Sequence, residues 1–265
     1  MLLNKIRYLV WHAWMLIDYS VSASLLRLKT KDPVRLRQLR LANNQRVTAR
    51  FLKAFRVTLK VNGRERLEAM RDSAYLLIAN HSTYLDVVLL AALERLVFIT
   101  SEEMGKNPFL GDLTRLGGCL YTNRKKKVTL PGEIARFTET IRQGFKVVLF
   151  PEGTSTDGSS IKAFRKSLFE VAVRAQCPVV PVCIRYLSID GQPVGPANRD
   201  LVAWYGDMSF LPHHLKILGH SMLVELTVLE PVAFDPQRGR GELSDLVYQR
   251  LLETFHAYDQ TIPSP

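Results

Sequence analysis

Hydrophobic and polar positions along the chain form short apolar runs separated by longer amphipathic stretches. Apolar runs that predict strands lie at residues 55–61, 75–79, 96–100, 117–122, 146–150, 178–184 and 222–229. Apolar residues recur at helical spacing over residues 130–144, 164–175 and 242–258. Strands that alternate with helices of this length are typical of a layered α/β domain with parallel strand pairs. We therefore expect a mixed, largely parallel sheet flanked by helices.

Three local features lead to narrower expectations. Asn62-Gly63 is a turn dipeptide, so the first strand should end in a hairpin. Pro178 and Pro181 favour an edge position, or a strand end, for the run at 178–184. Residues 191–221 carry Pro, Gly and His without periodicity, which predicts an irregular region.

Composition limits the class of protein. The chain has 265 residues, of which 47% are apolar and 23% charged, so it is globular and long enough for one α/β domain with a substantial core. Its three cysteines show no paired spacing, which makes a disulfide framework or a cysteine-rich zinc site a poor interpretation.

The net charge of +11 predicts an anionic partner such as nucleic acid, acidic lipid or a phosphorylated ligand. Nearly all of this excess lies between Lys29 and Arg71, where thirteen basic residues face three acidic ones. Because the remainder of the chain is close to neutral, the pattern favours one basic surface over a nucleic-acid groove spread across the fold.

An apolar segment precedes the basic one. Residues 8–28 have the length of a membrane span, but they contain His12, Asp18 and Arg27, which are costly in a bilayer centre. No small-residue cleavage site follows a clean apolar core, so a signal peptide is also a poor interpretation.

The same segment carries Trp11, Trp14 and Tyr19, aromatic residues that settle at the headgroup boundary. Together with the cations that follow, they favour a helix lying in the membrane interface. The alternative is a core-packing helix followed by a solvated basic one. We expect residues 1–54 to form a membrane-associating helical segment and residues 55–265 the α/β domain.

Two polar corners directly follow predicted buried strands. In the first, His81 precedes Asp86 by five residues across a strand-to-helix corner, a spacing that allows a carboxylate to hold an imidazole as a general base. A capping aspartate beside a surface histidine is the alternative. In open α/β sheets, ligands bind at the carboxyl ends of strands, where such corners lie.

The second corner is Phe150-Pro-Glu-Gly-Thr154, which presents the Glu152 carboxylate at a turn that glycine permits. It could bind substrate hydroxyls or simply end the strand. Lys162, Arg165 and Lys166 follow, and they face either an anionic ligand or solvent.

Taken together, the corners resemble the motifs of the glycerolipid acyltransferase superfamily, most of all the bacterial 1-acylglycerol-3-phosphate acyltransferases. The matching blocks are Asn80-His-x-x-x-x-Asp86, Gly118-Cys-Leu-Tyr-Thr-Asn-Arg124, Phe150-Pro-Glu-Gly-Thr154 and Val180-Pro-Val182. The resemblance covers roughly residues 55–235.

The resemblance implies a role for each matching residue. His81 would take the proton from the acceptor hydroxyl, with Asp86 orienting it, and the hydroxyl would attack the thioester of acyl-CoA or an acyl-carrier protein. Arg124 would bind the acceptor's phosphate. The residues implied in substrate binding are Asn80, Arg124, Glu152, Gly153, Thr154 and Pro181. No metal and no cofactor beyond the acyl donor are expected.

The acceptor implied first is 1-acyl-sn-glycerol-3-phosphate, a lysophospholipid, which would give phosphatidic acid at the cytoplasmic face of the inner membrane. Three departures bear on it: Ser155 where the family commonly has Arg, Asn123 for Asp, and Ser167 for Gly. They keep open another lyso-lipid such as lyso-ornithine lipid, and the loop at 204–214 resembles members of that kind. A non-catalytic basic module that binds membranes or nucleic acid is the alternative of another class. We expect membrane lipids and an acyl donor as partners, and no nucleic acid.

Overall fold

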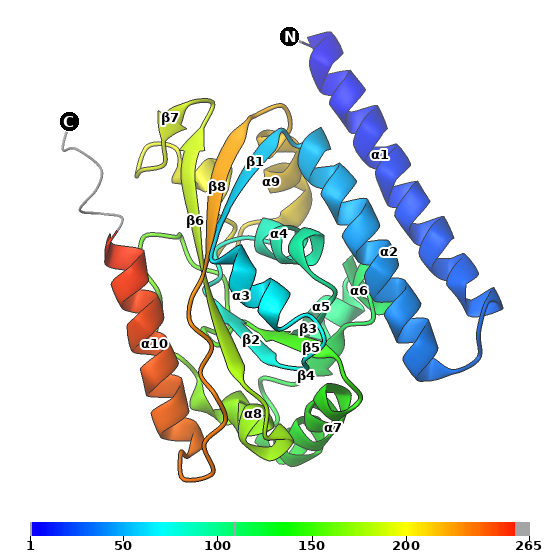
Figure 1. The fold of residues 1–265 in the computed structure, drawn as a ribbon. Helices are drawn as coiled ribbons and strands as arrows, with labels where there is room; N and C mark the ends of the chain where they lie inside the picture. The colour runs from blue at the N-terminus through cyan, green and yellow to red at the C-terminus, as the bar shows by residue number, and fades with distance from the viewer. Residues whose placement is uncertain (1, 109, 258–265) are drawn as a thin grey trace.

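The computed structural model describes residues 2–108 and 110–257, and a twisted sheet runs through its centre (Figure 1). The strands are β1 (Val57–Asn62), β2 (Leu76–Ala79), β3 (Leu96–Ser101), β4 (Leu120–Thr122), β5 (Lys146–Leu149), β6 (Val179–Ile189), β7 (Gln192–Pro193) and β8 (Met222–Val228). Their order is β1-β8-β6-β2-β5-β3-β4, with β7 paired to β6. Only the β6–β8 and β6–β7 pairs are antiparallel among these strands. The expected mixed, largely parallel sheet is confirmed.

Helices cover both faces of the sheet. They are α1 (Leu2–Leu25), α2 (Pro33–Ala54), α3 (Arg64–Ala69), α4 (Leu85–Leu93), α5 (Glu102–Lys106), α6 (Leu110–Leu116), α7 (Leu130–Arg142), α8 (Glu170–Ala175), α9 (Phe210–Ile217) and α10 (Arg240–Ala257). Short 3₁₀ turns lie at η1 (Leu26–Leu28), η2 (Lys127–Thr129), η3 (Lys166–Phe169) and η4 (Arg199–Leu201).

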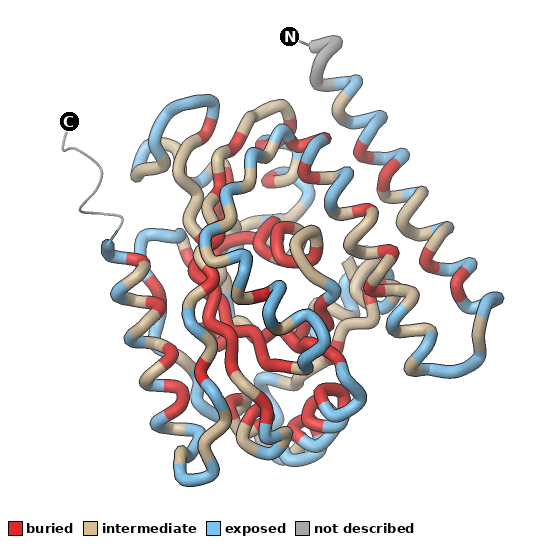
Figure 2. Tube along the Cα trace, in the orientation of Figure 1, coloured by how far each residue is buried: buried red, intermediate tan, exposed pale blue. Residues whose placement is uncertain are grey.

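Alternation along the strands divides the core into two layers. Ile78 faces a cluster shared with α7, α8 and α10, whereas its neighbour Leu77 faces a cluster shared with α2, α4 and α9. Because both faces are covered, β2 and β5 are buried at every position (Figure 2), and all of their residues except Lys146 are apolar.

The expected hairpin at Asn62-Gly63 is wrong. Gly63 instead opens α3 with φ of +73°, and β1 pairs in parallel with β8, with Val57 opposite Met222. A Cβ at Gly63 would lie 2.3 Å from the carbonyl oxygen of Val228, so the glycine permits a close approach to the end of β8.

An edge position for the proline-bearing strand is also wrong, because β6 lies between β8 and β2. The Pro181 carbonyl accepts a hydrogen bond from the Leu229 N–H at 2.9 Å. The backbone nitrogen of Pro181 points to the same side of β6 as its carbonyl, toward the segment that follows Val228, the last residue of β8. The proline therefore sits where the ladder ends and removes no bond from it.

Two helix boundaries differ from expectation. The helix predicted over 164–175 starts later, as η3 followed by α8, because the polar loop continues past Arg165. The region 191–221, expected to be irregular, contains α9. The helices predicted at 130–144 and 242–258 are confirmed as α7 and α10; residue 258 lies outside the described residues.

Helices α1 and α2 pack together along one side of the domain (Figure 1). Arg46 of α2 forms an ion pair with Asp18 of α1 at 3.0 Å, and the Tyr19 hydroxyl donates to the Leu113 carbonyl of α6 at 3.0 Å. The buried side chains of α1 and η1 (His12, Met15, Ala23 and Leu26) form the inward stripe.

The outward face of α1 and η1 is apolar as well. Its exposed large apolar residues are Ile6, Leu9, Val10, Trp11, Trp14, Ile17, Val21, Leu25 and Leu28, which we call the α1 outer face. Within the described residues, none of the helices combines the length and hydropathy needed to cross a membrane.

Near its middle, α1 is joined to the domain by a cluster of aromatic rings. The ring of His12 lies 4.2 Å from Phe55 of the α2–β1 junction and 5.7 Å from His214 of α9. Nδ1 of His214 is 3.4 Å from the hydroxyl of Tyr84. Burial lowers the pKa of His214 to about 4, so this contact is made by a neutral ring at neutral pH.

Candidate active site

Residues that directly follow three strands come together on the side of the sheet where the carboxyl ends of these strands lie. His81 follows β2, Glu152 follows β5, and Arg124 follows β4. β2 and β5 are direct parallel neighbours, and β3 alone separates β5 from β4. Their carboxyl ends therefore lie on the same side, where ligands bind in open α/β sheets.

His81 and Asp86 are in contact. Nδ1 of His81 lies 2.9 Å from Oδ2 of Asp86, whose carboxylate is buried in the first turn of α4. The same oxygen accepts hydrogen bonds from the backbone N–H groups of Ser82 at 2.7 Å and Thr83 at 3.0 Å. A carboxylate at this nitrogen places the ring proton on Nδ1, which leaves the lone pair of a neutral ring on Nε2.

The ring of His81 is held by stacking on a neighbouring ring and remains partly accessible to solvent. It stacks on Phe150 with centroids 4.2 Å apart, and 19% of the His81 side chain is exposed. Among the described residues, none hydrogen-bonds Nε2. This nitrogen can therefore accept a proton from a bound molecule.

Glu152 joins the two corners. Its carboxylate is 4% exposed and accepts the N–H of His81 at 2.7 Å through Oε1 and the N–H of Lys162 at 2.8 Å through Oε2. Burial raises its pKa to about 7, against the opposing effect of these hydrogen bonds. The structure directs both oxygens to backbone groups; a contact with the acceptor stays a prediction.

Asn80 extends the pairing of β2 with β6. Its Nδ2 donates to the Ile184 carbonyl at 2.9 Å and its Oδ1 accepts the Ile184 N–H at 2.8 Å, so the amide imitates one more residue of the ladder. Pro181 lies opposite Ile78 in the same pair of strands and is buried. The substrate-binding roles of these two residues stay predictions.

Arg124, Gly153 and Arg165 lie close together at the corner that follows β5. Gly153 has φ of +74°, and a Cβ there would lie 2.7 Å from Nε of Arg165, so the guanidinium rests on the glycine. Desolvation, and next repulsion from Arg165, lowers the pKa of Arg124. Neither guanidinium forms an ion pair with a described residue. Thr154 follows as an exposed residue. Sequence alone left Arg165 undecided between ligand and solvent, because the loop between Gly153 and Arg165 has no periodicity.

Ser155 and Thr156 form hydrogen bonds with the backbone of two neighbouring loops, those that contain Trp204 and His81. The Ser155 hydroxyl donates to the carbonyl of Trp204, whose N–H donates to the Ser82 carbonyl at 2.8 Å. The Thr156 N–H donates to the His81 carbonyl at 2.9 Å. The position where the family commonly has an arginine is thus used to fasten the loop at 204.

Sequence reasoning missed Tyr186. Its hydroxyl donates to Oδ1 of Asp86 at 2.8 Å from β6, 100 residues away in the chain. In the sequence it is an ordinary aromatic residue at the end of an apolar run, and no spacing signal connects it with Asp86.

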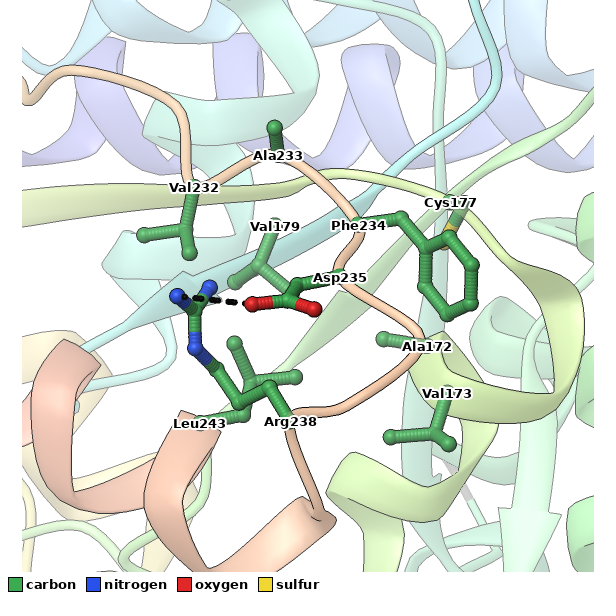
Figure 3. A pocket seen from close by; sticks show the side chains of 10 residues that line it. All are labelled: Ala172, Val173, Cys177, Val179, Val232, Ala233, Phe234, Asp235, Arg238 and Leu243. Atoms are coloured by element: carbon green, nitrogen blue, oxygen red, sulfur yellow. Dashed lines mark ion pairs between the residues drawn. The ribbon is translucent and has the colours of Figure 1, made fainter.

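Cavities elsewhere lie at the amino ends of the strands. One of about 10 Å³ lies between α8, the start of β6 and the Val232–Asp235 segment, beside the Asp235–Arg238 ion pair (Figure 3). It has room for at most about one water molecule. A groove of about 900 Å³ lies between α2, α3 and the turns before β3 and β5. In the described part of the chain, no group of three or more His, Cys, Asp or Glu side chains could hold a metal ion.

Comparison with known proteins supports the family resemblance that the sequence motifs indicate. A family model described as Acyltransferase matches residues 58–185. The lyso-ornithine lipid O-acyltransferase of Rhizobium meliloti is 34% identical over 192 residues, 69% of this chain and 66% of that protein. Its namesake from Pseudomonas aeruginosa is 33% identical over 200 residues, 74% of this chain and 71% of that protein.

The fold has a solved counterpart. The crystal structure of the 1-acyl-sn-glycerophosphate acyltransferase PlsC from Thermotoga maritima aligns with a TM-score of 0.66 over 99% of this chain and 100% of that one, at 20% identity. The likeness therefore extends to the two N-terminal helices.

Glu152 should make stability depend on pH. Its pKa is raised on folding, so the folded state holds the proton more tightly, and the free energy of unfolding falls as pH rises from about 4.5 to about 7. Compared with Glu152→Gln, the wild-type protein should lose on the order of 3 kcal/mol across this window. Urea unfolding at a series of pH values measures the difference. The exposed control Glu68→Gln should follow the wild type; parallel curves for wild type and Glu152→Gln would contradict the assignment.

Proposed function

Because the chain belongs to the Acyltransferase family, whose members among its relatives acylate lysolipids, we propose that His81 is the general base of its acyl transfer and Asp86 the partner that orients it. The observation that carries this proposal is the 2.9 Å contact between Nδ1 of His81 and the buried carboxylate of Asp86, at the edge of the sheet where Nε2 remains open.

The chemistry follows from this geometry. Nε2 removes the proton from the free hydroxyl of the lysolipid as its oxygen attacks the thioester carbonyl of acyl-CoA or acyl-carrier protein. Asp86 stabilises the imidazolium that forms. When the tetrahedral intermediate collapses, the carbon–sulfur bond breaks and the imidazolium returns the proton to the leaving thiolate. The products are an ester and a free thiol, and the enzyme itself is never acylated.

Removing the base should slow thiol release strongly. We expect His81→Ala to lower kcat by roughly 10²- to 10⁴-fold, and Asp86→Asn to lower it strongly too, because the ring loses its orientation. The assay follows free thiol with acyl-CoA or acyl-carrier protein and a lysolipid.

His220 provides a matched control, since its Nδ1 contacts Asp190 at 2.6 Å in a second histidine–aspartate pair outside the strand-end corners. His220→Ala should keep full turnover. Full turnover in His81→Ala would refute the base. Salt-sensitive binding to duplex DNA without any thioester turnover in the wild type would instead support a non-catalytic binding module.

We place the acceptor's anionic headgroup between Arg124 and Arg165. Two neighbouring guanidinium groups, neither in an ion pair with a described acid, favour an oxyanion between them, and repulsion from Arg165 contributes to the lowered pKa of Arg124. Gly153 permits this approach because it carries no side chain where Arg165 lies.

Of the two acceptors, a lyso-ornithine lipid fits the charge of the site better. Its headgroup offers one carboxylate and an ammonium group, whereas the phosphomonoester of 1-acylglycerol-3-phosphate would gain from a further cation. Ser155 stands where that cation is common, and its hydroxyl is occupied by Trp204. The relatives named above as lyso-ornithine lipid O-acyltransferases support the same choice. The phosphate acceptor is the second candidate, favoured by the pair of guanidinium groups.

Acceptor specificity tests this assignment. We expect a higher kcat/KM with lyso-ornithine lipid than with 1-acylglycerol-3-phosphate, and Arg165→Ala should raise the KM for the acceptor roughly 10- to 100-fold while leaving the KM for the donor unchanged. Lys166→Ala is the control, because Lys166 is already paired with Asp245 at 2.7 Å. A preference for the phosphate acceptor would overturn the choice of lipid, and an unchanged acceptor KM in Arg165→Ala would overturn the headgroup site.

We further propose that residues 1–54 hold the enzyme on the cytoplasmic face of the inner membrane, where its thioester donors occur. The α1 outer face presents apolar and aromatic side chains in one continuous row, which soluble proteins seldom expose. α2, which packs against α1, carries a further series of basic residues, and cations near a membrane surface attract anionic lipid. An amphiphilic acceptor could then reach the corner from the bilayer surface.

Trp11 and Trp14 should carry much of this binding, because about half of each side chain is exposed. We expect Trp11→Ser combined with Trp14→Ser to weaken binding to anionic vesicles roughly 10- to 100-fold in a sedimentation assay. Val128→Ser removes an apolar side chain that is even more exposed and lies outside α1, and it serves as the control. Equal losses in both variants would contradict the assignment to the α1 outer face.

A further inference from the structure

The two carboxylate oxygens of Asp86 accept hydrogen bonds from different parts of the fold. Oδ2 accepts three hydrogen bonds from its own corner, those of His81, Ser82 and Thr83. Oδ1 accepts one, from the Tyr186 hydroxyl at 2.8 Å. Local chain geometry therefore fixes one oxygen, whereas the rotation of the carboxylate about its Cβ–Cγ bond is fixed by a residue of β6.

The fold holds Tyr186 in place from both sides. Two residues before it, Ile184 is bound through its N–H and carbonyl to the Asn80 amide, next to His81. Directly after it, the pairing of β6 with β8 shifts register, so that Tyr186 lies opposite Val224 but Ser188 opposite Leu223. Such bulges redirect side chains, often next to active sites.

We infer that Tyr186 is a positioning residue of the acyl transfer, whose hydroxyl holds Asp86 in the orientation that keeps the Nε2 lone pair of His81 directed at the acceptor hydroxyl. This inference rests on the proposed function. The hydroxyl remains protonated, because desolvation and the adjacent Asp86 charge raise its pKa well above the usual value. It therefore acts as a hydrogen-bond donor throughout the reaction.

This hydrogen bond also limits how strongly Asp86 attracts a proton to His81. A carboxylate that shares charge with a phenol stabilises the imidazolium less than a carboxylate with one oxygen unpaired. The other titratable groups around the pair are Glu152 from the loop after β5 and Tyr84 ahead of α4. Among the described residues, no Lys or Arg forms an ion pair with Asp86. Tyr186 is therefore the main group outside the β2–α4 corner that affects the charge of the Asp86 carboxylate.

Tyr186→Phe tests the inference while preserving the volume of the ring. We expect kcat to fall roughly 10- to 100-fold, with the KM values for donor and acceptor unchanged. The acid limb of the kcat/KM profile should move to higher pH by roughly half to one unit, because the base is freed only at higher pH. A merely structural hydroxyl would not move this limb.

Tyr75→Phe is the matched control. Tyr75 is a buried tyrosine of the same core layer, at the amino end of β2, and its hydroxyl has no hydrogen-bond partner among the described residues. It should leave both kcat and the pH profile unchanged. An unshifted acid limb in Tyr186→Phe, or a change confined to the acceptor KM, would overturn the positioning role.

A second readout does not need turnover. Diethylpyrocarbonate modifies neutral imidazole, and mass spectrometry can follow its addition to His81 as a function of pH. The midpoint should rise in Tyr186→Phe by the same half to one unit and stay fixed in Tyr75→Phe. If the wild type transfers no acyl group, the proposed function fails, and the modification midpoints still decide whether Tyr186 controls His81. Equal midpoints in all three proteins would overturn the inference.

Discussion

The buried carboxylate of Asp86 is the constraint on which the site depends. A buried charge is tolerated only where hydrogen-bond donors surround it. Here they come from the β2–α4 corner and from the middle of the sheet, through Ser82, Thr83, His81 and Tyr186. Because the charge needs these donors, the corner cannot relax into the ordinary capping turn that the sequence also allowed. The need to satisfy Asp86 is what orients His81.

Glu152 extends the same principle to the neighbouring strand. Its oxygens accept one N–H from each of two loops, so a single carboxylate links the loops after β2 and β5. Desolvation raises the pKa of this carboxyl group, and the two backbone hydrogen bonds offset only part of that effect. Two of the motif residues, Asn80 and Glu152, likewise use their side chains to bind the protein's own backbone.

Much of the fold could be predicted from local pattern. Short runs that are wholly or almost wholly apolar identified β2 and β5, and helical spacing identified α7 and α10, because burial on both faces of a sheet and on one face of a helix leaves a clear pattern. Pairing between distant strands could not be predicted in this way. The edge position inferred from Pro181 was wrong because a proline at the end of a partner strand costs nothing, and that depends on where β8 stops. The hairpin at Gly63 was wrong because the dipeptide marks a turn but not its direction.

Prediction of the site from the sequence is limited in the same way. His81 and Asp86 are five residues apart, so their contact follows from local chain geometry. Tyr186 reaches Asp86 only because Asn80 fastens β6 at Ile184, and Arg165 reaches Gly153 only through a loop without regular structure. Such contacts are set by tertiary packing, which leaves no period in the sequence.

The pairing of β1 with β8 has a consequence for biosynthesis. β1 begins at Val57, yet its partner strand ends at Val228, so the sheet cannot be completed until most of the chain has left the ribosome. Helices α1 and α2 emerge long before that moment. The apolar row on α1 is thus exposed before the sheet can be completed, so whatever covers this row can bind it before the corners that hold His81 and Glu152 are assembled.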